Sequence, residues 1–254
     1  RPRGACMKRL DVIGVGPAGP EWVTPETREL IEQATDLVGY GPYLDRLASE
    51  RHRCHPSDNR VELERAAEAL DLAAEGRRVA VVSGGDPGIF AMAAALCEVL
   101  DHQARPEWAD VEFEVHPGVS ALQAAAARVG APLGHDFCAI SLSDNLKPWS
   151  VIANRLQLAA RADFAMAFYN PRSSSRPWQL GEALSLLRAE QPGETPVVFA
   201  AAVGRPDEWV RMTTLAEADP TEVDMRTVVL VGNSRGRYVR HGDRWFVYSP
   251  RDYV

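Results

Sequence analysis

Segment 79–91 restricts the possible folds more than any other part of the chain. An apolar stretch at 79–82 runs into the turn Ser83-Gly84-Gly85-Asp86-Pro87-Gly88, and a helix is predicted from residue 89. Glycine lets the backbone approach a bound molecule closely, and Pro87 stiffens the turn. This pattern predicts a strand of an α/β sheet with a ligand-binding edge, although an ordinary connection between strand and helix has the same signature.

Strands and helices alternate through the first half of the chain. One helix is expected to begin at Thr24-Pro25-Glu26, which supplies an N-cap, a first-turn proline and an acid. Another is expected between a cap at Asn59 and a stop at Gly76, and Gly39-Tyr40-Gly41-Pro42-Tyr43 is expected to be an aromatic loop. Strands are predicted at 10–15, 37–39, 79–83 and 111–115, and further helices at 89–100 and 120–130. This alternation favours a largely parallel sheet with covered faces.

The second half of the chain has a different pattern. Helices at 148–160 and 178–189 separate its first three strands, whereas its last strands follow one another through turns. The strands are predicted at 138–142, 164–169, 197–201, 209–215, 228–232, 238–241 and 244–248. We therefore predict two α/β domains, 7–118 and 119–254, of which the second contains a mixed sheet, and we expect the functional chain to start at Met7.

Composition argues against several classes of protein. Lys and Arg number 28 against 35 Asp and Glu, a net charge of −7, which disfavours nucleic acid as a partner. No Cys-x-x-Cys pair and no histidine pair at metal-ligand spacing occurs, so no metal site is predicted. No apolar run reaches the roughly 20 residues of a membrane span. A cytoplasmic setting with reduced cysteines is expected.

The spacing Gly14-x-Gly16-x-x-Gly19 matches a dinucleotide-binding fingerprint, but its context does not fit. Pro17 and Pro20 prevent a helix from starting inside the glycine run, where a pyrophosphate would meet the helix N-terminus. The acid that binds the ribose should also close the second strand, whereas Asp36 precedes it. A nicotinamide-dependent dehydrogenase is therefore disfavoured.

Four motifs, in this order, resemble those of the tetrapyrrole methylases: Gly14-Val15-Gly16-Pro17, Gly84-Gly85-Asp86-Pro87, Pro117-Gly118-Val119-Ser120-Ala121 and Tyr169-Asn170-Pro171. The resemblance implies two α/β domains in the class III methyltransferase arrangement, with S-adenosylmethionine in the interdomain cleft and S-adenosylhomocysteine as its product. It also implies a homodimer.

Further segments resemble the members of that family that act at C17. They are Gly39-Tyr40-Gly41-Pro42-Tyr43, Asp136-Phe137, Ile140-Ser141-Leu142-Ser143-Asp144, Pro148-Trp149, Tyr169-Asn170-Pro171-Arg172-Ser173 and Gly204-Arg205-Pro206. The expected activity is methylation of precorrin-3B at C17, with ring contraction to precorrin-4, in cobalamin biosynthesis. One alternative is that the substrate is cobalt-factor III. A second is a sibling methylase that acts at another carbon of the macrocycle, on diphthamide or on ribosomal RNA. A third is a tetrapyrrole carrier without catalytic activity.

The resemblance also assigns site residues. Those expected at the cofactor are Pro17, Gly84, Gly85, Asp86, Gly88, Ile89, Phe90, Ser120, Ala121, Phe168, Tyr169, Val203, Thr213 and Thr214. Those expected at the substrate, a macrocycle with many carboxylates, are Tyr40, Tyr43, Lys147, Arg172, Arg176 and Arg205. His116, His135 and Asp144 are candidates for the base that ring contraction requires, and none of them is preferred. Asn145, Lys147 and Val203 depart from the residues expected of the family.

Overall fold

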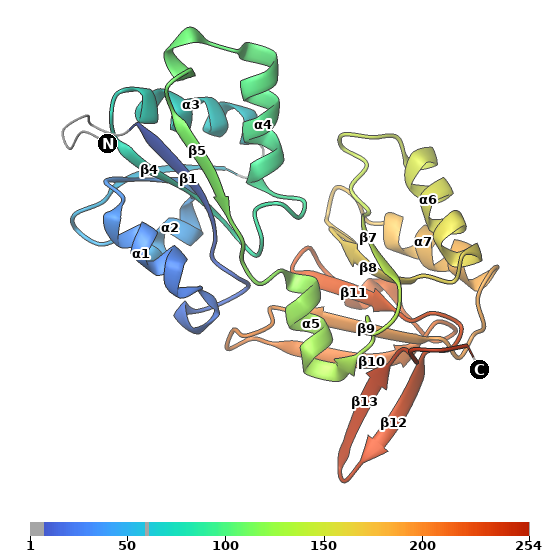
Figure 1. The fold of residues 1–254 in the computed structure, drawn as a ribbon. Helices are drawn as coiled ribbons and strands as arrows, with labels where there is room; N and C mark the ends of the chain where they lie inside the picture. Colours follow the sequence, from blue (N-terminus) through green and yellow to red (C-terminus); the bar gives the residue numbers. More distant parts are fainter. Residues whose placement is uncertain (1–7, 59–60, 254) are drawn as a thin grey trace. The chain divides into compact units, whose positions relative to one another are not determined.

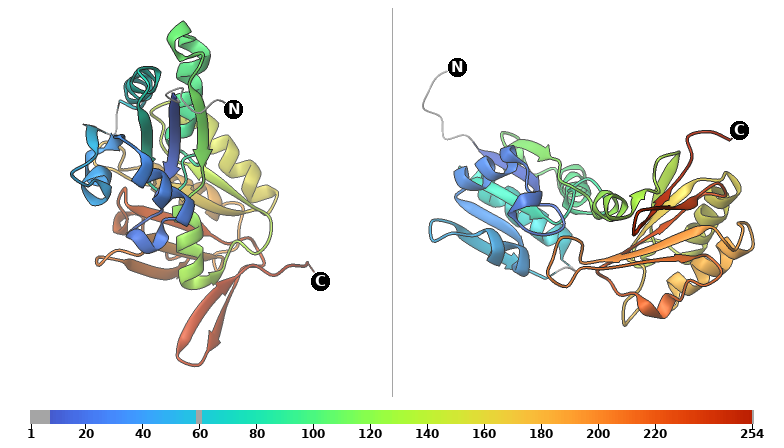
Figure 2. Two further views of the ribbon diagram at one scale, coloured as in Figure 1. Left: turned by 60° about the vertical axis from the view of Figure 1, so that its left-hand side comes forward. Right: turned by 90° about the horizontal axis from the view of Figure 1, so that it is seen from below.

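The computed structural model describes residues 8–58 and 61–253 (Figures 1 and 2). The chain divides into two compact units, which are joined between Ser120 and Ala121. Met7 and Asn59, the expected start and the expected helix cap, lie outside the described residues.

The first unit contains one parallel sheet. Its strands are β1 (Arg9–Gly14), β2 (Asp36–Tyr40), β3 (Arg53–Ser57), β4 (Arg78–Ser83) and β5 (Glu112–His116), in the order β3-β2-β4-β1-β5. Every neighbouring pair is parallel. The central strands β1 and β4 are almost entirely buried, which agrees with the parallel, covered sheet predicted from the sequence.

Helices cover both faces of this sheet. Ile31 of α1 (Pro25–Gln33) and Leu44 of α2 (Gly41–Leu47) join one apolar cluster, whereas α3 (Glu62–Ala74) and α4 (Met92–Gln103) join the other. The adjacent strands β1 and β4 are therefore followed by helices on opposite faces. Their carboxyl ends form a topological switch point, the place where open α/β sheets bind ligands. Short 3₁₀ helices lie at Pro20–Trp22 and Pro106–Trp108.

Two predictions for the first unit were wrong in detail, and one strand was missed. The expected aromatic loop is instead the end of β2 and the start of α2, because Pro42 fits the first turn of a helix. Strand β3 was not predicted, since Arg53-Cys54-His55-Pro56-Ser57 lacks an apolar run; it is an edge strand, where proline is tolerated. Helix α4 begins at Met92 rather than at residue 89, because Phe90 has a φ of 54° within the preceding turn.

The second unit contains the predicted mixed sheet. Its strands are β7 (Phe137–Ser141), β8 (Ala165–Tyr169), β9 (Pro196–Ala201), β10 (Trp209–Thr214) and β11 (Thr227–Val231), in the order β10-β9-β11-β8-β7. Only the pair β7–β8 is parallel among the neighbours described. Leu156 of α6 (Trp149–Arg161) and Leu184 of α7 (Gln179–Arg188) pack into the core of this sheet with Phe168 and Phe199.

The predicted hairpin forms a separate small sheet. Its strands, β12 (Arg237–His241) and β13 (Arg244–Tyr248), pair with each other, and β13 also pairs with β6 (Gly130–Ala131). Strand β6 follows α5 (Ala121–Val129) and is too short to be predicted from a pattern. In Figure 1 the hairpin extends away from the rest of the second unit. A 3₁₀ helix lies at Pro220–Glu222.

Candidate functional site

Three turns meet at the carboxyl edge of the first sheet. They follow β1, β4 and β5, and they meet at Gly14, Gly16, Gly85 and Gly118, which we call the glycine cluster. The Gly16 amide donates to the Gly85 carbonyl over 3.2 Å, and the Gly85 amide donates to the Gly16 carbonyl over 2.9 Å. The cluster therefore lies at the switch point between β1 and β4 and is held by backbone groups.

Only glycine fits these positions. A Cβ on Gly118 would lie 2.2 Å from the Gly85 carbonyl oxygen, and one on Gly14 would lie 2.6 Å from the Gly118 nitrogen. Gly16 and Gly85 also have φ values of 70° and 64°, which side chains disfavour. The backbones of these turns therefore pack directly against one another, which side chains at these positions would prevent.

Asp86 fastens two of the turns to each other. Its Oδ1 accepts from the Gly88 amide over 2.8 Å, and its Oδ2 accepts from the Gly118 amide over 3.1 Å. The carboxylate expected at the cofactor thus has a clear structural role, since it fixes the turn after β5 against the turn after β4.

Aromatic residues lie beside the same edge. A Cβ on Gly84 would lie 2.6 Å from the hydroxyl oxygen of Tyr43, so this ring packs directly on the turn. Tyr40 and Tyr43 contact edge to face, with ring centroids 5.4 Å apart. The side chain of Phe90, at the end of the turn, is 51% exposed. The sequence-predicted residues of the first unit therefore gather at one edge.

In the second unit, β7, β8 and β9 end at one edge of the sheet, as their register shows. Asn170 follows β8 with a φ of 52° and donates from its Nδ2 to the Ser141 hydroxyl over 3.0 Å. The Tyr169 hydroxyl accepts from the Leu122 amide at the start of α5 over 3.0 Å. Val203, also at this edge, is buried.

The loop after β7 places Asp144 and Lys147 close to this edge. Gln179 donates from its Nε2 to Asp144 Oδ1 over 3.0 Å, and Lys147 donates to the Ser143 carbonyl over 3.3 Å. Burial lowers the pKa of Lys147 and repulsion from Arg155 lowers it further, while attraction to Asp144 opposes both. The loop thus carries a fixed carboxylate and a partly desolvated ammonium group.

Two of the arginines expected at the substrate have structural partners. Arg176 is only 6% exposed and donates to the carbonyls of Leu142 and Asn170, and burial lowers its pKa. Arg176 was expected at the substrate, and the structure instead shows it bonded to these two carbonyls, which need a donor where water is excluded. Arg172 donates to the carbonyls of Pro177 and Thr221. Arg205 lies in the turn after β9, where its amide donates to the Ala202 carbonyl.

The structure separates Thr213 and Thr214 from Val203, which was also expected at the cofactor. They pair with Val197 and Pro196 at the start of β9, whereas Val203 follows its end. Thr213 is four residues along β10 from Trp209, which pairs with Ala201 at the end of β9. Four residues of strand correspond to about 13 Å. Thr213 and Val203 therefore lie toward opposite ends of β9.

Phe168 is fully enclosed by the core of the second unit. Its ring packs with the apolar side chains around β8, and only its backbone remains for a contact with a ligand.

The three candidate bases lie in different surroundings. His135 precedes β7, at the edge opposite to Asp144, and its ring accepts from the Asp136 amide over 2.8 Å. His116 is buried and bonded to Asp11. Only Asp144 lies at the carboxyl edge of the second sheet.

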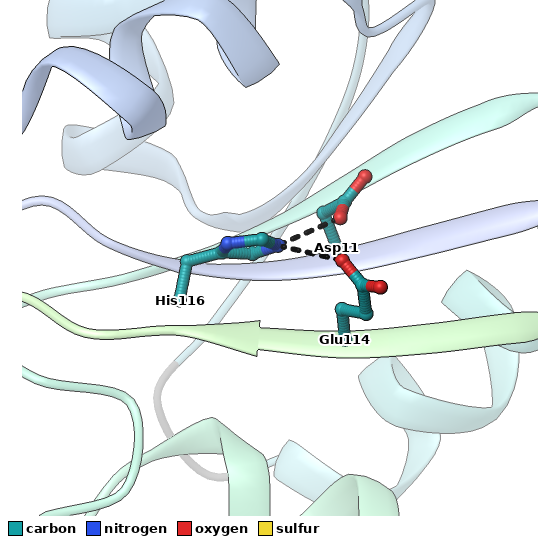
Figure 3. Close-up of side chains that lie close together, drawn as sticks. All are labelled: Asp11, Glu114 and His116. Atoms are coloured by element: carbon teal, nitrogen blue, oxygen red, sulfur yellow. Dashed lines mark hydrogen bonds and ion pairs between the residues drawn. The ribbon is translucent and has the colours of Figure 1, made fainter.

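A charged cluster that the sequence did not predict lies on β1 and β5. Its members Asp11, Glu114 and His116 are shown in Figure 3, and their ligand atoms are close enough for a metal ion. The guanidinium of Arg9, however, donates to Asp11 over 2.9 Å and to Glu114 over 2.6 Å. A cation of the chain itself thus bridges these two carboxylates. The sequence signal was an aspartate in an otherwise apolar strand, Leu10-Asp11-Val12.

No helix within residues 8–58 and 61–253 combines the length and the hydropathy needed to cross a bilayer.

A family model described as Tetrapyrrole (Corrin/Porphyrin) Methylases matches residues 9–219. A precorrin-3B C(17)-methyltransferase of Sinorhizobium sp is 54% identical over 247 residues, covering 96% of this chain and 97% of that protein. A probable cobalt-factor III C(17)-methyltransferase of Salmonella typhimurium is 40% identical over 252 residues, covering 96% and 99%.

Solved structures agree with this similarity. The crystal structure of the methyltransferase CobJ matches with a TM-score of 0.89 and 54% identity, covering 95% of this chain and 99% of that one. A uroporphyrin-III C-methyl transferase of Thermus thermophilus, complexed with S-adenosyl homocysteine, matches with a TM-score of 0.65 and 22% identity, covering 88% and 97%. The second likeness shows the fold alone.

Proposed function

Because the chain belongs to the tetrapyrrole (corrin/porphyrin) methylases, we propose that it is an S-adenosylmethionine-dependent methyltransferase that acts on precorrin-3B at C17, with ring contraction to precorrin-4, in cobalamin biosynthesis. The observation that carries the proposal is the 54% identity to the Sinorhizobium enzyme over 96% of this chain. Identity to the Salmonella cobalt-factor III protein is lower, at 40%. We therefore propose the metal-free precorrin-3B, rather than cobalt-factor III, as the substrate.

The glycine cluster fits the polar parts of S-adenosylmethionine. An ammonium, a carboxylate and a ribose need acceptors and donors at close range, and peptide groups at a switch point supply both. A Cβ at Gly14 or Gly118 would collide with the backbone of the neighbouring turns and so disturb this arrangement. We assign to the cofactor Pro17, Gly84, Gly85, Asp86, Gly88, Ile89, Phe90 and Ser120 from the first unit, and Ala121, Tyr169, Val203 and the backbone of Phe168 from the second.

The chain's part in methyl transfer is alignment and exclusion of water. S-adenosylmethionine supplies an electrophilic methyl group on its sulfonium. Asp86 and the glycine cluster hold the turns of the first unit rigid, and rigid turns keep the donor in one orientation. Methyl transfer itself asks for little acid–base chemistry from the protein.

Ring contraction requires removal of a hydroxyl proton, and Asp144 is the group we assign to it. Its Oδ1 is held by Gln179, which orients the carboxylate. His116 is committed to Asp11, and His135 lies at the other edge of its sheet.

The carboxylates of the macrocycle need cations, and its flat ring needs apolar surface. Lys147 is the cation at the loop after β7, next to the fully exposed Leu146. The rings of Trp149 and Trp178 contact each other at 5.0 Å, and Trp178 is 47% exposed. We assign Lys147, Arg205, Tyr40 and Tyr43 to the substrate, together with Trp178, which the sequence pattern did not single out.

We also infer a homodimer in the cytoplasm, with neither nucleic acid nor membrane as a partner. The net charge of −7 argues against nucleic acid as a partner, and the resemblance to family members supports the homodimer. Sedimentation of the purified protein measures the oligomeric state.

The activity is tested with methyl-labelled S-adenosylmethionine under anaerobic conditions. Precorrin-3B and cobalt-factor III are supplied in parallel, and products are identified by mass spectrometry and carbon NMR. We expect label at C17 of a ring-contracted product, with precorrin-3B as the faster substrate. If S-adenosylhomocysteine binds but neither acceptor receives the label, the proposed substrate is wrong. If S-adenosylhomocysteine does not bind, the proposed methyltransferase activity is wrong.

A further inference from the structure

The Asp11–His116 pair lies in the strands that lead directly into the glycine cluster. Asp11 precedes Gly14 by three residues in β1, and His116 precedes Gly118 by two at the end of β5. The His116 Nε2 lies 2.8 Å from Asp11 Oδ1, and Figure 3 shows this contact across the two strands. Both residues are buried, at 6% and 8% exposure, so their hydrogen bond is shielded from water.

Charged groups from three elements enclose this pair. Arg9 of β1 donates to both oxygens of Asp11 and to Glu114 of β5. Glu26 of α1 lies 3.5 Å from His116 Nδ1, and Glu114 lies 3.8 Å from Nε2. The imidazole thus connects the central strand, the edge strand and the helix that follows the first glycine turn.

The position of β5 depends strongly on such links. It is an edge strand, and among the residues that the structure describes β1 is its only strand partner. Their register ends at the pair Ile13 and His116. Pro117 then follows with a fixed φ, which leaves little freedom before Gly118.

Gly118 itself has no room to move. Its missing Cβ position lies 2.2 Å from the Gly85 carbonyl and 2.9 Å from the Gly14 Cα, and its amide donates to Asp86 over 3.1 Å. A small displacement of the end of β5 would therefore open this contact or lose the hydrogen bond to Asp86.

We propose that His116 and Asp11 are positioning residues for the cofactor, which act by fixing Gly118 against Gly85 and Asp86. This inference rests on the proposed function, because it assumes that the glycine cluster binds S-adenosylmethionine. The pair is connected to the cofactor only through the backbone of these turns and takes no part in proton transfer.

The test compares His116→Ala and His116→Gln with the wild type and with His102→Ala, an exposed histidine on α4 that serves as control. The probe is S-adenosylhomocysteine, measured by calorimetry, and the Michaelis constants for both substrates are measured as well. We expect His116→Ala to bind the probe about tenfold more weakly and to raise the KM for S-adenosylmethionine, with kcat and the KM for precorrin-3B unchanged. His116→Gln, which can still donate to Asp11, should recover most of the affinity.

Thermal unfolding of each variant shows whether it is folded. If His116→Ala does not fold, His116→Asn, which is too short to reach Asp11, replaces it. A folded His116→Ala that binds like wild type would overturn the proposal, as would equal losses in His116→Ala and His116→Gln. If the wild type itself does not bind the probe, the proposed function fails first, and the two failures are thus distinguished.

Discussion

In the first unit, the turns after β1, β4 and β5 meet through the peptide groups of four glycines. In the second unit, the ends of β7 and β8 are joined by side chains, among them Asn170 on Ser141 and Arg176 on two carbonyls. The glycine turns of the first unit bring backbone segments close to one another and give this edge a fixed shape. The second gives groups that can carry charge or exchange protons, and we therefore expect binding to depend mainly on the first edge and chemistry on the second.

The largest effect is expected at Asp144. Asp144→Asn retains an oxygen for Gln179 but can no longer accept a proton, so formation of precorrin-4 should slow about 100-fold or more, with S-adenosylhomocysteine affinity unchanged. Single-turnover kinetics measure this rate. The control is Asp136→Asn, an exposed carboxylate at the other end of β7. A normal rate in Asp144→Asn would show that this carboxylate at the second edge does not take the proton.

Gly118→Ala should damage binding rather than chemistry. The new Cβ would meet the Gly85 carbonyl, and the strain of 1–3 kcal/mol usual for such overpacking corresponds to roughly tenfold to hundredfold weaker binding of S-adenosylhomocysteine. Gly41→Ala is the matched control, because its Cβ would lie 3.8 Å from Pro56. Equal affinities of these two variants would contradict the role of the glycine cluster.

Arg176→Met is expected to affect stability alone. It leaves the carbonyls of Leu142 and Asn170 without their donor, which should lower the free energy of unfolding by about 3 kcal/mol. Chemical denaturation measures this loss, with Arg155→Met, an exposed position on α6, as control. Substrate affinity lost without loss of stability would instead show that Arg176 binds the macrocycle.

The smallest effects are expected at two carboxylates at the amino edges of the sheets, the buried Asp36 and the half-buried Asp163. Burial opposes ionisation of Asp36, but hydrogen bonds from Thr35, His55 and Arg77 outweigh it, and its pKa is lowered from 3.8. Burial likewise opposes ionisation of Asp163, and hydrogen bonds from Ser234, Tyr253 and Gln191 lower its pKa.

A lowered carboxyl pKa stabilises the fold above the unfolded value, and this stabilisation is lost as the pH falls through the folded value. Asp36→Asn and Asp163→Asn should each cost about 1–2 kcal/mol near neutral pH, and the difference from wild type should shrink below pH 3.8. Urea unfolding at a series of pH values measures both. If the difference in the free energy of unfolding between variant and wild type stayed constant down to pH 2, the stability would not depend on the ionisation of these carboxylates.

The two edges also differ in what the sequence predicted. The glycine turns were predicted because a strand that ends in glycine and proline is a local pattern, and the structure brings Gly14, Gly85 and Gly118 together. Strand β3 and helix α2 were missed because each contains a proline, which usually ends a strand or a helix. Pro56 lies in an edge strand and Pro42 in a first helical turn, and both positions accept proline.

The contacts of the second edge could not be predicted, because they depend on register between distant segments. Nothing near Arg176 in the sequence indicates that two carbonyls need it, and nothing near Thr213 indicates that it pairs with Val197 rather than following the end of β9. The same holds for Asp11 and His116, which are 105 residues apart in the sequence.

The two hydrogen bonds of Asp86 have a consequence for folding. Its carboxylate joins the turn after β4 to the turn after β5, and these strands lie on either side of β1. Neither turn can reach its final geometry until all three strands are in place. We therefore expect this edge to form as one cooperative unit late in folding, with the amides of Gly88 and Gly118 gaining and losing protection from hydrogen exchange together.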